Sequence, residues 1–151
     1  MTLDKDTLIN LLKEPWQTIV VQGGKITKFP FDSSYSLSGI WVYVSMHWIE
    51  IGTTEIEDEE FILSICTLDE PPIPEKLRNK PPRKILEYCP PDCDFKKLLV
   101  YGVEDIKADD LEQKDGELLS VSPLFIKCKD GTVFKISSNE RVLGDIILEE
   151  V

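Results

Sequence analysis

Catalytic motifs are scarce in this sequence. It has a single histidine, His47, and contains neither a G-x-S-x-G nor an H-E-x-x-H motif. Gly23-Gly24 is too short for a phosphate-binding loop, and no helical pattern follows it. The spacing places no nucleophile or acid beside His47, so we interpret it as a packed histidine with one hydrogen bond. These absences predict a protein that is not an enzyme and that uses no cofactor.

Long hydrophobic runs are also missing. The most apolar window, Gly39–Gly52, is too short to cross a bilayer and contains His47 and Glu50. The N-terminus carries charged residues instead of the basic start and apolar stretch of a signal peptide. We therefore expect a cytoplasmic protein, most simply a bacterial one.

Cysteine is limited to four residues, and free thiols are expected in the cytoplasm. Cys89 and Cys93 have a spacing that zinc permits, and they could also form a transient disulfide. Zinc sites usually need a second ligand pair, however, and Cys66 and Cys128 stand alone on separate predicted strands. We expect no structural metal, and we interpret Cys66 and Cys128 as small core hydrophobes.

Positive charge is outweighed by negative charge. The 151 residues carry a formal net charge of −11, which argues against binding to nucleic acid or to anionic membranes. Such a charge raises solubility, and it also attracts basic proteins. Two sets of acidic residues are candidates for binding such a partner. The first comprises Glu55, Glu57, Asp58, Glu59 and Glu60, and the second comprises Asp109, Asp110 and Glu112. The first set lacks the glycine and the alternating oxygen ligands of a calcium loop.

Proline is concentrated in one stretch. We expect a single globular domain over residues 1–151 with a proline-rich connection at 69–94. Seven of the ten prolines lie between Pro71 and Pro91, and a short helical turn is predicted at Lys84–Tyr88. Residues 71–76 match a PxxP-x-basic ligand pattern. The stretch is locally basic, so it could also contact an acidic partner or the domain's own acidic face.

The N-terminal half alternates between helix and strand patterns. A helix capped by Asp4 or Asp6 is expected to end before Pro15. Strands are predicted at Trp16–Gln22 and Lys25–Phe31 with Gly23-Gly24 as a hairpin turn. Ile40–Ile51 is apolar on both faces, which predicts one central strand. A turn at residues 55–60 and a returning strand at 61–68 complete this half.

The C-terminal half is predicted to contain a strand at Phe95–Val103 and an acidic loop with a weak helix at Ile106–Leu111. A hairpin with a three-residue loop, Lys129–Gly131, pairs Leu124 with Ile136 and Ile126 with Phe134, because this register keeps apolar residues together. A last strand is predicted over Val142–Glu149. The pattern as a whole predicts an α+β fold in which the N-terminal helix packs on a mostly antiparallel sheet of about seven strands, sandwich-like or a partly closed barrel.

The functional hypothesis follows from charge and from the missing motifs. We expect a non-enzymatic domain that binds a basic protein partner, as an inhibitor, an immunity-type antagonist or an adaptor does. One alternative is a small-molecule-binding β domain with a pocket lined by Trp41, Tyr43, His47 and Trp48. Another alternative is an enzyme with an active site that cannot be recognised from the spacing of residues in the sequence. The oligomeric state stays open.

Overall fold

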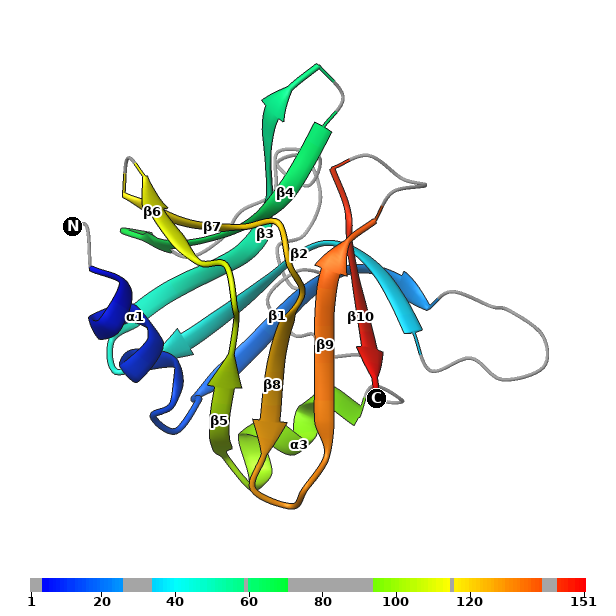
Figure 1. Cartoon of the computed structure of the whole chain (residues 1–151). Helices are drawn as coiled ribbons and strands as arrows, with labels where there is room; N and C mark the ends of the chain where they lie inside the picture. The colour runs from blue at the N-terminus through cyan, green and yellow to red at the C-terminus, as the bar shows by residue number, and fades with distance from the viewer. Residues whose placement is uncertain (1–3, 26–33, 59, 71–93, 115, 140–143) are drawn as a thin grey trace.

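A computed structural model of the chain describes residues 4–25, 34–58, 60–70, 94–114, 116–139 and 144–151. The described elements are, in chain order, α1 (Lys5–Leu12), β1 (Thr18–Lys25), β2 (Ser34–Val44), β3 (His47–Glu57), β4 (Glu60–Leu68), the 3-10 helix η2 (Asp94–Lys96), α3 (Lys97–Val100), β5 (Val103–Lys107), β6 (Glu112–Lys114), β7 (Glu117–Ser120), β8 (Leu124–Cys128), β9 (Val133–Ser138) and β10 (Ile146–Glu150). Figure 1 shows their arrangement. The predicted helical turn at Lys84–Tyr88 and the PxxP pattern lie outside the described residues.

The ten strands form one antiparallel sheet in the order β5-β8-β9-β10-β2-β3-β4-β7-β6, and β1 pairs with β2 outside this path. β1 occupies one edge of β2 over residues 35–43. The opposite edge of β2 is shared by two strands, because β10 pairs with residues 34–37 of β2 and β3 pairs with residues 40–44. From this fork the sheet curls into a half-barrel (Figure 1). The predicted α+β class and the partly closed antiparallel sheet are confirmed, although the described residues form ten strands and not about seven.

The core fills the inside of the half-barrel. Its side chains come from both halves of the sheet, from α1 and from the η2–α3 segment. Phe95 is fully buried and makes edge contacts with Trp16 and Phe134, at ring-centroid distances of 5.7 and 5.1 Å. Burial of one such apolar side chain stabilises the fold by roughly 1.5–3 kcal/mol, so these contacts hold the helical segments against the sheet.

Helix α1 begins and ends as the sequence predicts. The Asp4 side chain accepts a hydrogen bond of 2.7 Å from the backbone N–H of Thr7, which identifies Asp4 as the N-cap. Leu8 and Leu12 are buried on the core side. The indole Nε1 of Trp16 donates to the Leu12 carbonyl at 2.7 Å, so one of the last carbonyls of the helix is satisfied by a side chain.

The prediction of one strand over Ile40–Ile51 is wrong. The segment is a hairpin, because Ser45 and Met46 have φ values of 46° and 66° and form a two-residue turn between β2 and β3. Ile40 pairs with Ile51. The turn contains no glycine, proline or asparagine, and both faces of the segment are apolar, so neither composition nor alternation indicated it. The predicted central position is correct, since β2 contacts β1, β3 and β10.

The hairpin predicted at Gly23-Gly24 is also wrong. β1 continues through both glycines and pairs with β2, with a register shift between Gln22 and Gly23. Adjacent glycines are compatible with a bulge inside a strand as well as with a tight turn, so the local pattern did not distinguish the two. The rest of the strand predicted at Lys25–Phe31 lies outside the described residues.

Two further predictions in the C-terminal half are corrected. Phe95–Val103 contains η2 and α3, in which Phe95 and Leu98 are buried three residues apart, as in a helix. The region predicted as an acidic loop with a weak helix at Ile106–Leu111 contains the strands β5 and β6. Short patterns of this kind fit helix and strand almost equally well. Pairing with β8 and with β7 decides the outcome for β5 and β6.

The predicted C-terminal hairpin is confirmed. Leu124 pairs with Ile136, and Ile126 pairs with Phe134. The backbone N–H of Gly131, at φ +98°, donates to the Cys128 carbonyl at 3.0 Å and closes the three-residue loop. The last strand begins at Ile146, and residues 140–143 lie outside the described part of the chain.

Candidate functional site

The end of the β3–β4 hairpin extends beyond its neighbours in the sheet. β2 pairs with β3 only as far as Ile51, and β7 pairs with β4 only from Leu63 onward. Residues 53–58 and 60–62 therefore form a projecting two-stranded hairpin, which we name the acidic arm (Figure 1). Its four described acids are all exposed: Glu55, Glu57, Asp58 and Glu60. Glu59 lies outside the described residues.

Side-chain hydrogen bonds fix the base of the acidic arm. The Thr53 hydroxyl donates to the Gly144 carbonyl at 2.8 Å, and the Ser138 hydroxyl donates to the Phe61 carbonyl at 3.0 Å. These bonds connect the arm to the end of β9 and to Gly144, which lies between β9 and β10. The arm is thus held in a defined direction, which lowers the ordering entropy that a binding surface must lose on association.

The charges on the acidic arm are not neutralised within the described residues. Glu57 and Glu60 lie opposite each other in the register. Like charges in such a pair disfavour folding. The ion pairs of the described residues lie elsewhere, on α1, α3 and the β5-β8-β9-β10 half of the sheet, and they are Lys13–Asp105, Lys97–Asp130, Lys127–Glu104 and Lys135–Glu149. Among the described residues, nothing therefore neutralises the exposed negative charge of the arm.

The second predicted acidic set is separate from the arm. Asp109, Asp110 and Glu112 are exposed at the connection of β5 with β6 and at the start of β6. Asp110 accepts a hydrogen bond from the Ser122 hydroxyl. β7 lies between β6 and β4, so the strand that carries Glu112 is not a direct neighbour of the strand that carries Glu60.

The four predicted pocket residues are divided between the two faces of the sheet. Tyr43 lies opposite Trp48 on the outer face, and Trp41 lies on the same face. His47 lies opposite Val44, on the face that carries Ile49 and Ile51. A continuous strand would place His47 on the same face as Trp41 and Tyr43, but the turn at 45–46 reverses the alternation. The half-buried His47 has its Nδ1 atom 2.8 Å from the Ser45 carbonyl oxygen.

Sequence reasoning missed Glu50 on this outer face, and it wrongly placed Cys66 in the core, whereas Cys66 is half-buried here. Glu50 lies opposite Trp41 on β2 and opposite Cys66 on β4. Trp41 Nε1 donates to Glu50 Oε2 at 2.8 Å, and the Cys66 thiol lies 3.9 Å from Glu50 Oε1. The only sequence signal was one acid two residues after Trp48 in an apolar segment. Burial, together with the negative charges of Glu50 and Glu117, raises the pKa of the Cys66 thiol to about 12.

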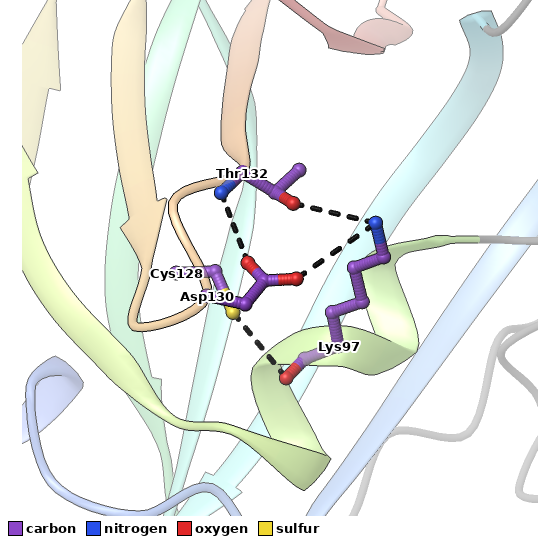
Figure 2. Close-up of polar contacts among 4 residues, drawn as sticks. All are labelled: Lys97, Cys128, Asp130 and Thr132. Carbon is purple, nitrogen blue, oxygen red and sulfur yellow. Dashed lines mark hydrogen bonds and ion pairs between the residues drawn. The ribbon is translucent and has the colours of Figure 1, made fainter.

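A polar cluster fastens the β8–β9 hairpin to α3 (Figure 2). Lys97 Nζ lies 3.3 Å from the Thr132 hydroxyl and 3.8 Å from Asp130 Oδ2, and the Cys128 thiol donates to the Lys97 carbonyl at 3.5 Å. The backbone N–H of Thr132 donates to Asp130 at 2.9 Å and lowers the pKa of that carboxyl. Burial raises the pKa of Cys128, which is a core residue as predicted. The cluster thus joins two structural elements.

No protein-family model matches this chain. Neither the curated proteins nor the solved structures contain a match to it. Within the described ranges, no helix is long and apolar enough to cross a membrane. Among the same residues no group of three or more His, Cys, Asp and Glu side chains is arranged to hold a metal ion. Cys66 and Cys128 are free thiols, whereas Cys89 and Cys93 lie outside the described part.

Proposed function

We propose that this chain is a non-enzymatic binding domain and that its acidic arm recognises a basic protein partner. The observation that carries the proposal is the arm itself, a projecting hairpin with four exposed acids and no ion pair within the described residues. Opposite charge on a partner would relieve the repulsion between Glu57 and Glu60. Because the arm is fixed at its base, the partner meets these charges in a constant arrangement.

Electrostatic attraction of this kind acts mainly on the association rate. Long-range steering accelerates encounter, and salt screens it over about 10 Å at about 0.1 M ionic strength. Exposed charges contribute little to folding stability, about 1 kcal/mol or less each. Charge reversal on the arm should therefore slow association while the domain stays folded.

The test compares two variants with the same change in net charge. One reverses three acids of the arm (Glu55→Lys, Glu57→Lys and Glu60→Lys), and the other reverses Asp109, Asp110 and Glu112 to Lys. The immobilised chain is used to isolate a partner, whose association rate is then measured at about 50 mM and about 150 mM salt. We expect a basic partner and an association rate that falls as the salt concentration rises. The association rate of the arm variant should be at least about tenfold lower than that of the unmodified chain.

Three outcomes would contradict the proposal. The first is recovery of acidic partners only, which would favour binding through the basic proline-rich segment. The second is an association rate that does not respond to salt or to the arm variant. The third is an equal loss for both variants, because a uniform effect of net charge would then replace a local effect of the arm.

A further inference from the structure

The outer face of the β2–β3 hairpin combines two aromatic rings with a carboxylate. Tyr43 and Trp48 are direct cross-strand neighbours with ring centroids 5.0 Å apart and an interplanar angle of 46°. Glu50 follows Trp48 on the same face of β3. All three residues are half-buried, so each keeps part of its surface open to solvent. Aromatic faces and a carboxylate attract the same kind of ligand, a cation.

The Glu50 carboxylate has no counter-charge among the described residues. Its two contacts there come from neutral donors, the Trp41 indole and the Cys66 thiol. Apolar surface borders the carboxylate, because Trp48 and Leu68 pack with Trp41 in a small outer cluster. A partly desolvated carboxylate without a cation is energetically unfavourable, and a bound cation would compensate for this cost.

Trp41 holds the carboxylate in place. An added Cβ at Gly39 would lie 2.9 Å from Cη2 of the Trp41 ring, so the indole lies directly against the backbone at Gly39. Trp41 is only 7% exposed. Its N–H therefore points to Glu50 from a fixed position, and among the described residues Oε1 contacts only the weak thiol donor. The negative charge is arranged in advance of any ligand.

Cys66 lies within the field of two negative charges, those of Glu50 and Glu117. Its thiol is held in the neutral form mainly by burial and in addition by the charges of Glu50 and Glu117, which together raise its pKa. The charges of Glu50 and Glu117 disfavour a further anion on this face and favour a cation, whereas burial disfavours a charge of either sign.

We propose that Tyr43, Trp48 and Glu50 form a binding site for the guanidinium group of an arginine side chain on a protein partner. Guanidinium is planar and stacks on aromatic rings, and its N–H groups can meet a carboxylate while the plane rests on a ring. A lysine ammonium is more strongly hydrated and cannot stack. The site lies outside the acidic arm, so it can be tested independently of the function proposed for the arm.

The test uses blocked tripeptides as probes, Gly-Arg-Gly and the neutral isostere Gly-citrulline-Gly. Binding is followed by the indole N–H signals of the 15N-labelled full chain. The arginine peptide is expected to shift the signals of Trp48 and Trp41 and to bind about tenfold more tightly than the citrulline peptide. Glu50→Gln should weaken the binding of the arginine peptide by about the same factor of ten. The amide oxygen introduced by this substitution can still accept from Trp41, so an unchanged Trp41 indole signal in the free variant shows that the face is intact.

Two further variants make the test specific. Glu149→Gln removes the same charge from an acid that pairs with Lys135 on the other half of the sheet, and it should leave binding unchanged. Trp48→Leu keeps an apolar side chain but removes the ring, and it should weaken binding about threefold. Equal affinity for both peptides, a normal affinity in Glu50→Gln, or tighter binding of tetramethylammonium than of the arginine peptide would overturn the proposal.

Discussion

Replacement of Met46 by glycine should stabilise the protein. Met46 has a φ of 66° in the turn between β2 and β3, and its side chain is 84% exposed. A side chain in this left-handed conformation costs roughly 1–2 kcal/mol, and glycine avoids that cost. Glycine also raises the entropy of the unfolded chain, and this lowers the gain in stability by about 0.5–1 kcal/mol. The net gain should be about 0.5–1 kcal/mol, equivalent to a rise in Tm of about 1–4 °C for a chain of this size.

The sign of this effect distinguishes the hairpin from the continuous strand that the sequence alone predicted. In a continuous strand, glycine at position 46 would lower stability by about 0.5–1 kcal/mol. The assay is urea unfolding followed by tryptophan fluorescence, with Gly131→Ala as the matched control. Gly131 has a φ of +98°, and no atom lies within 4 Å of an added Cβ, so the substitution should cost about 1–2 kcal/mol through backbone strain alone. A loss of stability in Met46→Gly would refute the assigned turn.

Three further predictions concern the core and the outer face. Gly39→Ala should lower the free energy of unfolding by about 1–3 kcal/mol and shift the tryptophan emission, because its Cβ would lie 2.9 Å from Trp41. Leu12→Ala should cost about 2–5 kcal/mol in urea unfolding, since Leu12 is fully buried. The Cys66 thiol, with its pKa raised to about 12 by burial and Glu50, should resist alkylation at pH 9. Because the unfolded thiol ionises first, the contribution of Cys66 to stability should be lost between about pH 9 and about pH 12, and Cys66→Ala should weaken that pH dependence.

Local chemistry was sufficient for several elements. Asp4 caps α1, and Gly131 closes the β8–β9 hairpin in the predicted register. In these cases the relevant contacts lie within a few residues of one another, so cap preference, glycine conformation and hydrophobic pairing all favour the same structure. Glu55, Glu57, Asp58 and Glu60 are exposed for a similarly local reason, since charged side chains next to a turn remain solvated.

The candidate sites depended on contacts between distant parts of the chain. The sequence contained the acids of the arm, but the projection exists because β2 leaves β3 at Ile51 and β7 meets β4 only at Leu63. On the outer face, a turn of two ordinary residues, Ser45 and Met46, moved His47 away from Trp41 and brought Tyr43 beside Trp48.

By itself the sequence determined the class of fold, the acidic surface and those turns whose residues are locally committed to one conformation. Only the tertiary structure decided which strands pair, which face each aromatic residue occupies, and that Glu50 meets Trp41 and Cys66 from three different strands. The physical reason is that side chains alternate between the two faces of a strand with a period of two residues. A single turn that leaves no mark in composition therefore exchanges the faces of every residue that follows it in the strand.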